Sequence, residues 1–298
     1  MPTKKFRSLL FIPASRPDMV ERAHERAADA IILDMEDGVA ESEKIAARKN
    51  LNSLLESLQG KGIETLVRIN SLETGGDLDI RAIAETFSPP LLLPKITDPK
   101  QVSAVEDCWL SCRSDMSGEH SNETSRKTAR ETVLSTLRLL PMIECPTGLF
   151  RVEQIARATK RVNALVFGSE DFAAEAGLST EIEALAMPAQ WVALAAAANG
   201  ISAYGLPGSL GNYHNMELFE ATLKRARTIG FTGSVCIHPK QVLIANDVFR
   251  PSKEEIDWAT AVITQAGTDG ASGGASGGNI GMVDAPVLAR AQAILARV

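Results

Sequence analysis

Residues 137–144 read Leu-Arg-Leu-Leu-Pro-Met-Ile-Glu, an apolar run that ends in a carboxylate. Short runs rich in Leu, Ile and Met are typical of strands buried on both faces, as in a parallel sheet covered by helices. An ionised carboxylate beside such a strand is costly unless a cation or hydrogen bonds stabilise it. This stretch therefore predicts a core strand with a functional acid, Glu144, at its carboxyl end.

Apolar runs of the same kind recur along the chain and alternate with longer amphipathic stretches, which predicts strands joined by helical crossovers. The eight expected strands are residues 8–12, 30–33, 65–69, 91–94, 137–143, 164–167, 201–204 and 234–237. The expected helices include residues 18–28, 41–58, 101–112, 149–158, 183–198 and 216–228. Eight strand–helix units in 298 residues favour an α/β fold of the (β/α)8 TIM-barrel type over an open doubly wound sheet.

Two stretches interrupt this rhythm. Residues 113–131 are rich in Ser, Glu, Thr and Arg, so we expect a solvated excursion there. Residues 267–281 form a flexible Gly/Ser linker, and an amphipathic helix is expected within residues 284–298. The sequence thus predicts a catalytic barrel over residues 1–266, a linker over 267–281, and a C-terminal lid or swapped helix over 282–298.

Composition excludes several classes of partner. The chain has 31 Lys and Arg residues against 37 Asp and Glu residues, without a basic stripe, so nucleic acid is not an expected partner. No apolar run approaches the roughly 20 residues that span a bilayer. The N-terminal residues lead directly into a strand-like segment, and we therefore expect a cytoplasmic protein.

The carboxyl ends of barrel strands converge on one mouth, so polar residues that follow each strand are functional candidates. Glu144 follows the fifth expected strand and Asp171 the sixth, and both carboxylates would meet there. Two carboxylates with waters and substrate oxygens form a common Mg²⁺ environment. The alternative is a salt bridge between these acids and Arg68 or Lys95.

Three acids, Asp34, Glu36 and Asp37, follow the second strand, and nearby cations must relieve their repulsion. Arg68 lies in an otherwise apolar strand, and its planar fork suits a substrate carboxylate or an enolate oxygen. The alternative for Arg68 is a buried ion pair with Glu36. For Asp34 and Asp37, a direct catalytic role and a structural role that orients the basic groups are both open. The candidate counterions are Arg16, Arg68 and Lys95.

His238 follows the eighth strand in the turn Cys236-Ile-His-Pro239. A histidine at the mouth is a candidate acid–base group. A lone histidine before proline is more often a structural hydrogen-bonding group, and this interpretation also remains open.

Together these motifs resemble the citrate lyase β-subunit family, within the metal-dependent aldolases of the phosphoenolpyruvate/pyruvate barrel superfamily. The resemblance covers almost the whole chain, and its strength lies in the order and spacing of many short motifs. They are Arg7-Ser-Leu-Leu-Phe-Ile-Pro13, Ile32-Leu-Asp-Met-Glu-Asp-Gly-Val39, Val67-Arg-Ile-Asn70, Leu93-Pro-Lys95, Ile143-Glu144, Phe167-Gly-Ser-Glu-Asp171, Ile237-His-Pro-Lys-Gln-Val242 and Met282-Val-Asp-Ala-Pro286.

The resemblance implies Mg²⁺ at Glu144 and Asp171, with Arg68 contacting the substrate. It also implies that Asp284 comes from a mobile C-terminal segment, often that of a neighbouring subunit in a trimer. Arg16 and His238 lie in segments similar to those that meet the thioester arm of coenzyme A or of an acyl carrier protein. Two segments depart from the family pattern: Gly205-Leu-Pro-Gly208 stands where many relatives have an acid, and Ser234-Val235 where many have a lysine.

The resulting hypothesis is a cytoplasmic, homotrimeric, Mg²⁺-dependent carbon–carbon lyase. It would cleave a β-hydroxyacyl thioester of the malyl-, citramalyl- or citryl-CoA type into an acyl thioester and an α-keto acid. The candidate catalytic residues are Arg68, Asp284, Glu36 and Asp37, and the candidate substrate-binding residues are Arg16, Arg68, Lys95 and His238. Two alternatives stay open: a β-hydroxyacyl-CoA thioesterase on the same site, and a non-catalytic, acyl-carrier-binding subunit of a larger lyase complex.

Overall fold

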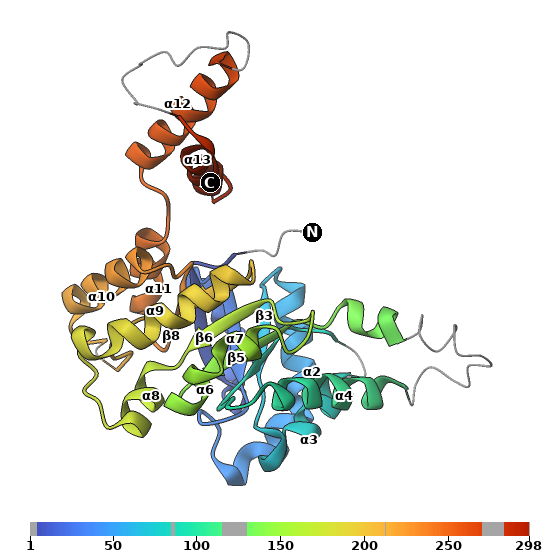
Figure 1. The fold of residues 1–298 in the computed structure, drawn as a ribbon. Helices are drawn as coiled ribbons and strands as arrows, with labels where there is room; N and C mark the ends of the chain where they lie inside the picture. Colours follow the sequence, from blue (N-terminus) through green and yellow to red (C-terminus); the bar gives the residue numbers. More distant parts are fainter. Residues whose placement is uncertain (1–4, 85–86, 115–129, 212, 270–282, 298) are drawn as a thin grey trace. The chain divides into compact units, whose positions relative to one another are not determined.

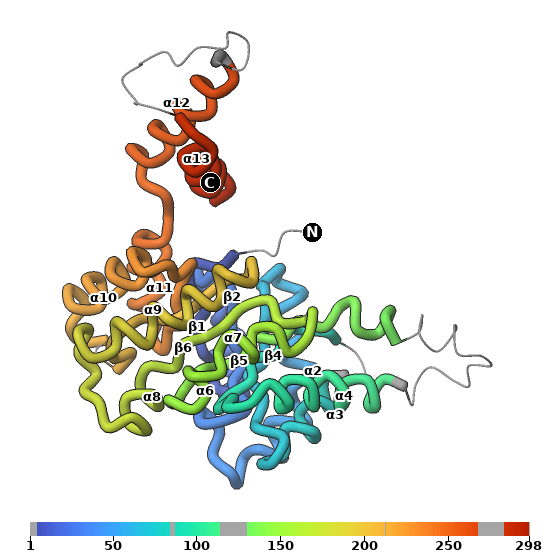
Figure 2. The backbone as a smooth tube through the Cα atoms, viewed as in Figure 1, coloured from blue at the N-terminus to red at the C-terminus, as the bar shows by residue number. Residues whose placement is uncertain are grey.

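The computed structural model describes residues 5–84, 87–114, 130–211, 213–269 and 283–297, and Figures 1 and 2 show its fold. Contacts within the chain divide it into two compact units, Met1–Asn246 and Asp247–Val298. The first unit is a (β/α)8 barrel of eight parallel strands, which confirms the predicted fold class. Among the described helices, none is long and apolar enough to cross a membrane.

The barrel strands follow one another around the sheet in the order β7-β6-β5-β4-β3-β2-β1-β8. They are β1 (Ser8–Pro13), β2 (Ala30–Asp34), β3 (Thr65–Arg68), β4 (Leu91–Leu93), β5 (Leu139–Ile143), β6 (Ala164–Phe167), β7 (Ser202–Tyr204) and β8 (Ser234–Cys236). Each agrees with its predicted strand within two residues at either end. Between β7 and β8 the barrel closes through a parallel bridge from Tyr204 to Gly233.

Helices surround this sheet, as Figure 1 shows. In the barrel unit they are α1 (Pro17–Glu21), α2 (Lys44–Gly60), α3 (Gly76–Ala84), α4 (Pro99–Ser114), α6 (Pro146–Phe150), α7 (Val152–Ala156), α8 (Ser169–Ala176), α9 (Ile182–Ala198), α10 (Met216–Thr228) and α11 (Pro239–Val248). The fully buried strand residues, such as Leu9, Ile31, Leu91 and Leu139, form the core beneath these helices. Burying each such side chain contributes about 1.5–3 kcal/mol.

Two predicted helices are wrong in their extent. The predicted helix 18–28 is split into α1 and a 3₁₀ turn, Ala23–Arg26, which ends because Ala27 adopts a left-handed conformation with φ 56°. The predicted helix 149–158 begins earlier, because the Sγ atom of Cys145 accepts a hydrogen bond from the backbone N–H of Gly148 and caps α6. The backbone at Arg151 then interrupts it before α7.

The second unit contains α12 (Lys253–Asp269) and α13 (Ala285–Leu295), which pack together through Ala259, Val262 and Ala291. The Asp284 carboxylate begins α13 by accepting a hydrogen bond from the Val287 N–H at 3.0 Å. Helix α12 continues through the first residues of the predicted linker 267–281, most of which lies outside the described residues. Most of the predicted solvated segment 113–131 also lies outside the described residues. The division into barrel, linker and C-terminal segment stays a prediction.

Candidate active site at the barrel mouth

Glu144 lies at the carboxyl end of β5 and is only 4% exposed. Its Oε2 atom accepts a hydrogen bond from the backbone N–H of Lys95 at 2.6 Å. Burial raises the pKa of the Glu144 carboxyl to about 8, and the charges of Glu36 and Asp171 act in the same direction. A nearby cation would stabilise the ionised form of this buried carboxylate, because it replaces the stabilisation that water gives to an exposed carboxylate.

The backbone beside Glu144 leaves room for its carboxylate. A Cβ atom at Gly168, the residue after β6, would lie 2.5 Å from the Cγ atom of Glu144, so a larger residue would displace this side chain. Asp171 is exposed on the first turn of α8, close enough for its charge to affect the pKa of Glu144. The structure thus brings the two predicted metal-binding carboxylates to adjacent positions of the mouth.

This pair fits a hard divalent cation. Magnesium prefers oxygen ligands and commonly keeps several water positions, so one or two protein carboxylates suffice. Within the described part of the chain, no group of three or more His, Cys, Asp and Glu side chains is arranged to hold a metal ion. Any further ligands would therefore be water or substrate oxygens.

Arg68 lies at the end of β3, directly opposite Asp34 in the register of β2 and β3. Its Nε and Nη2 atoms donate to the two Asp34 oxygens at 2.7 and 2.6 Å, and the guanidinium stacks over the Phe11 ring at 4.8 Å. Burial acts to lower the pKa of Arg68, but the hydrogen bonds and charge of Asp34 raise it overall. Asp34 therefore orients Arg68. It also occupies the edge of the guanidinium, formed by Nε and Nη2, that could otherwise have bound a substrate carboxylate through two hydrogen bonds.

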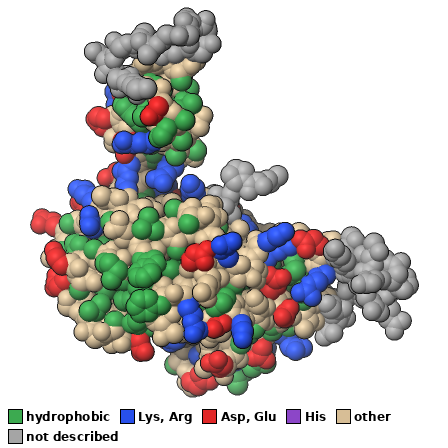
Figure 3. All heavy atoms as spheres, viewed as in Figure 1, with side chains coloured by type: hydrophobic (Ala, Val, Ile, Leu, Met, Phe, Trp, Pro, Cys, Tyr) green, Lys and Arg blue, Asp and Glu red, His purple; other side chains and the backbone are tan. Residues whose placement is uncertain are grey.

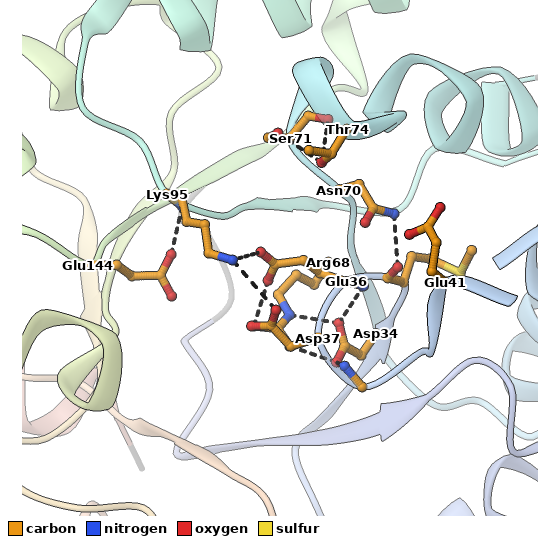
Figure 4. A network of polar contacts seen from close by, with 12 residues as sticks. Asp34, Glu36, Asp37, Glu41, Arg68, Asn70, Ser71, Thr74, Lys95 and Glu144 are labelled. Carbon is orange, nitrogen blue, oxygen red and sulfur yellow. Dashed lines mark hydrogen bonds and ion pairs between the residues drawn. The ribbon is translucent and has the colours of Figure 1, made fainter. Parts of the chain in front are cut away.

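The remaining nitrogen of Arg68 faces the acids at the mouth (Figure 4). Its Nη1 atom lies 2.9 Å from Glu36 Oε2 and 3.6 Å from Asp37 Oδ2. The predicted buried ion pair between Arg68 and Glu36 is thus present. Arg68 presents a single nitrogen, suited to one oxygen at a time, toward the region where Glu36 and Asp37 lie.

Lys95 links the acid cluster to Glu144. Its Nζ atom lies 2.8 Å from Glu36 and 3.5 Å from Asp37, and the hydrogen bond to Glu36 raises the pKa of Lys95 to about 12. Burial raises the pKa of Glu36 despite both cations. Lys95 has φ 54°, a conformation that costs energy for a residue other than glycine. Such strain often marks a functional site, and here it accompanies the backbone contact to Glu144.

Two other candidates, Arg16 and His238, make their contacts elsewhere in the barrel unit. Arg16 forms an exposed pair with Asp18 at 2.9 Å. The Nδ1 atom of His238 accepts a hydrogen bond from the Lys240 N–H at 3.1 Å, and its ring stacks on Tyr213 at 5.0 Å. This geometry supports the structural interpretation of His238. Asp284 belongs to the second unit.

Asn70, a polar residue that the sequence places at the end of the third strand, is supported by three side chains that sequence reasoning missed: Lys44 and Asp79 contact it directly, and Arg48 acts through Asp79. Asn70 donates to the Met35 carbonyl at 2.8 Å and to Asp79 at 2.6 Å, and it accepts a hydrogen bond from Lys44. Asp79 is fully buried and pairs with Arg48 at 2.6 Å. The available signal was the position of Asp79 between two apolar residues of an amphipathic helix.

A second missed contact concerns the loop after β7, where the family's acid is absent. Glu170, next to Asp171, accepts hydrogen bonds from the Ser209 hydroxyl at 2.5 Å and the Gly211 N–H at 3.2 Å. The side-chain amide of Gln241 donates to the Leu210 carbonyl at 2.8 Å. The loop is thereby tied to α8 and α11 beside the proposed metal pair.

A (β/α)8 barrel whose mouth gathers buried carboxylates around an arginine and a lysine is typical of enzymes that act on anionic substrates with a divalent metal. The chain belongs to the HpcH/HpaI aldolase/citrate lyase family, whose family model matches residues 7–239. It is an enzyme of the carbon–carbon lyase class found in this family.

Known proteins resemble the chain over most of its length. It is 34% identical to the (3S)-malyl-CoA thioesterase of Cereibacter sphaeroides, over 87% of this chain and 82% of that protein. It is 30% identical to the citrate lyase subunit beta of Escherichia coli, over 99% and 94%. The crystal structure of protein CitE from Mycobacterium tuberculosis, in complex with magnesium, acetoacetate and coenzyme A, has a TM-score of 0.70 at 28% identity and covers 97% of both chains.

Proposed function

We propose that the enzyme cleaves a β-hydroxyacyl thioester of the malyl-, citramalyl- or citryl-CoA type into an acyl thioester and an α-keto acid, with Mg²⁺ as cofactor. The observation that carries this proposal is the buried Glu144 carboxylate, whose pKa is raised by burial, with the Asp171 charge beside it. The Mycobacterium tuberculosis CitE structure, which contains magnesium and coenzyme A, supports the same cofactor and the same kind of substrate.

Glu144 and Asp171 would hold the cation. When bound, Mg²⁺ would act as a Lewis acid toward the oxygens of the half that becomes the keto acid. Because Glu144 accepts a hydrogen bond from the Lys95 N–H and packs against Gly168, its carboxylate would be positioned before any ligand arrives. Such preorganisation lowers the cost of binding.

The remaining groups would handle charge and protons. Cleavage removes the proton of the β-hydroxyl group and breaks the adjacent carbon–carbon bond, leaving the electron pair as a thioester enolate. Arg68 Nη1 would stabilise the charge on the enolate oxygen, and Glu36, with its raised pKa, and Asp37 are positioned near the same nitrogen to move a proton. Asp284 would deliver a proton to the enolate carbon when the C-terminal segment closes.

The products test the reaction directly. Incubating the purified enzyme with malyl-, methylmalyl-, citramalyl- and citryl-CoA plus Mg²⁺ should release an α-keto acid and an acyl thioester from at least one of them. Excess EDTA should abolish this cleavage, and added Mg²⁺ should restore it. Turnover that is near normal in EDTA would contradict the metal assignment, and release of neither product from all four thioesters would contradict the proposed substrate class.

Replacing Asp284 by Asn should reduce turnover at least about a hundredfold, because a general acid–base group contributes roughly 10²–10⁴-fold. Binding of a thioester substrate should change little. Asparagine is as good an N-cap as aspartate, so α13 should still begin at the same residue. Single-turnover kinetics and calorimetric titration measure the two effects separately, and an unchanged rate would remove Asp284 from the mechanism.

A second candidate function is hydrolysis of the β-hydroxyacyl thioester. The 34% identity to a (3S)-malyl-CoA thioesterase favours it specifically. Hydrolysis releases a free hydroxy acid with coenzyme A, whereas lysis releases a keto acid, so the product assay distinguishes them. The third possibility, a non-catalytic acyl-carrier-binding subunit, predicts no turnover by the isolated chain and is disfavoured by the assembled acids and Arg68.

The partners and assembly are also proposals. Arg16 and His238 would contact the thioester arm of coenzyme A or of an acyl carrier protein from outside the acid cluster. We further propose a cytoplasmic homotrimer in which Asp284 serves its own or a neighbouring barrel.

A further inference from the structure

Two turns of the barrel share a sequence and a hydrogen-bonding pattern. Residues 99–102 and 239–242 both read Pro-Lys-Gln-Val, and they begin α4 and α11. In each turn the side-chain Oε1 atom of the glutamine accepts hydrogen bonds from two backbone N–H groups. They are those of Thr97 and Asp98 at 2.8 and 3.1 Å for Gln101, and those of Ile237 and His238 at 2.9 and 3.1 Å for Gln241. These contacts fix which end of each amide is the oxygen, and they leave each Nε2 atom to donate elsewhere.

The two amide nitrogens differ in their surroundings. The Nε2 atom of Gln241 donates to the carbonyl of Leu210 at 2.8 Å, and this leucine is buried. The Nε2 atom of Gln101 has no acceptor among the residues that the structure describes, and Gln101 lines a cavity of about 220 Å³. We call it the β3–β4 cavity, because the segments after β3 and β4 line it together with α4. After β8, an amide carbonyl that carries a branched apolar side chain satisfies the same donor.

The walls of the β3–β4 cavity are mostly apolar. Ile69, Leu93, Ile96 and Val105 line it, and all four are buried. Figure 3 shows charged side chains of both signs on the outer surface around α3 and α4. Among the described residues that line the cavity, by contrast, only Glu73 is charged, and it is exposed. An anion would find no cation there, so the cavity suits an uncharged molecule.

The volume limits the size of that molecule. An apolar cavity of about 150 Å³ in another protein binds benzene, so about 220 Å³ has room for a molecule of roughly seven to ten non-hydrogen atoms. A hydrogen-bond donor among apolar walls recognises an oxygen acceptor on an apolar body. We propose that the β3–β4 cavity binds a small uncharged carbonyl compound, an amide or a ketone with a branched or aromatic group, whose oxygen accepts a hydrogen bond from Gln101 Nε2.

The cavity lies behind the strand ends that carry two cations of the mouth. Pro94 and Ile96, which line it, flank Lys95, and Ile69 directly follows Arg68. Neither Arg68 nor Lys95 is itself among the described lining residues. A bound molecule would therefore contact the chain on both sides of Lys95 without entering the cluster of acids. The site is separate from the proposed catalytic groups, and the proposal does not depend on the reaction.

Titration of the full chain with isovaleramide, followed by ligand-observed NMR, tests the binding. This amide carries a branched apolar group, and it should bind saturably with a dissociation constant of about 1 mM. The isovalerate anion has the same shape but a negative charge, and it should bind at least about tenfold more weakly. Saturating coenzyme A and Mg²⁺ should leave the affinity for the amide unchanged. Displacement by coenzyme A would place the amide in the substrate site and overturn the proposal, as would equal affinity for isovalerate or the absence of saturable binding.

The variant Gln101→Glu tests the hydrogen bond. Glutamate keeps an oxygen for the N–H groups of Thr97 and Asp98 but lacks the Nε2 donor, so isovaleramide should bind at least about tenfold more weakly. Gln154→Glu, at an exposed residue of α7, adds the same charge outside the cavity and should bind the amide normally.

The variant Ala104→Phe tests the location. Ala104 is an exposed residue of α4 that lines the cavity, so a phenyl ring at this position should occupy the binding space and abolish the binding of isovaleramide. Ala197→Phe, at an exposed residue of α9, is the matched control and should bind normally. Circular dichroism identifies the folded variants. Unchanged affinity in a folded Gln101→Glu or Ala104→Phe protein would overturn the proposal, whereas a lack of thioester cleavage by the wild-type enzyme would leave all these binding results as they are.

Discussion

Replacing Glu144 by Gln is expected to lower the rate of Mg²⁺-dependent cleavage by roughly a thousandfold, because the Lewis acid contributes several kcal/mol to the transition state. Glutamine keeps the shape of the side chain and still accepts the hydrogen bond from the Lys95 N–H. A lower cleavage rate in this variant would therefore reflect the missing negative charge of Glu144 rather than a change in packing. Steady-state kinetics over a wide range of Mg²⁺ concentrations measure it.

The same substitution should stabilise the metal-free protein at alkaline pH. The folded state raises the pKa of Glu144 from 4.5 to about 8 through burial, so the fold favours the protonated form. Protonated Glu144 contributes its full share to the free energy of unfolding below pH 4.5. This contribution is lost as the pH rises through about 8 and the buried carboxyl ionises. Glutamine avoids that loss, and we expect a gain of about 2–4 kcal/mol at pH 8.

Urea unfolding in EDTA at pH 5 and pH 8 measures this gain, which should be small at the lower pH. The matched control is Glu153→Gln, at an exposed residue of α7 that pairs with Arg157. It should leave both activity and the pH dependence of stability unchanged. Equal stability of wild-type and Glu144→Gln proteins at pH 8, or full Mg²⁺-dependent activity of the variant, would contradict the assignment of Glu144.

Replacing Arg68 by Lys should lower turnover by about 10²–10³-fold, since removing one donor to a developing oxyanion typically costs that much. Lysine keeps the positive charge but lacks the planar fork that donates to both Asp34 oxygens while another nitrogen forms the ion pair with Glu36. The ammonium group would settle on the buried acids, away from the substrate oxygen. Rapid-quench measurement of the chemical step checks this.

Arg151→Lys provides the control for Arg68. Arg151 also forms a short ion pair, with Asp98 at 2.6 Å, but on the outside of the barrel. This variant should turn over normally. If Arg68→Lys also retained normal turnover, Arg68 would be a purely structural ion-pair partner of Asp34 and Glu36.

The sequence predicted the strands well because most are short, largely apolar runs. A polar residue marks the end of some of them, as in Ala30–Asp34 and in Leu139–Ile143, which Glu144 follows. It also predicted part of the cluster at the mouth, because barrel closure brings consecutive strand ends together, whereas Arg16 and His238 make their contacts elsewhere. Glu36, Arg68, Lys95 and Glu144, from four different strand ends, do lie close together.

Other features could be predicted only in part or not at all. The sequence offered Asp34 as one of the acids that orient the basic groups, and the structure confirms it for Arg68, but the choice of Arg68 as its partner depends on strand register. The positive φ of Lys95, whose N–H donates to Glu144, has no signal in the residue pattern. Helix ends were also missed, since a cysteine cap at Cys145 and a left-handed Ala27 follow from local geometry rather than residue preference.

The acids gathered at the barrel mouth give the proposed metal site a definite response to ionic strength. Salt screens the attraction between these carboxylates and a divalent cation, so the proposed Mg²⁺ binding should weaken as the salt concentration rises. Half-maximal activity should therefore need more Mg²⁺ in concentrated salt than in dilute buffer.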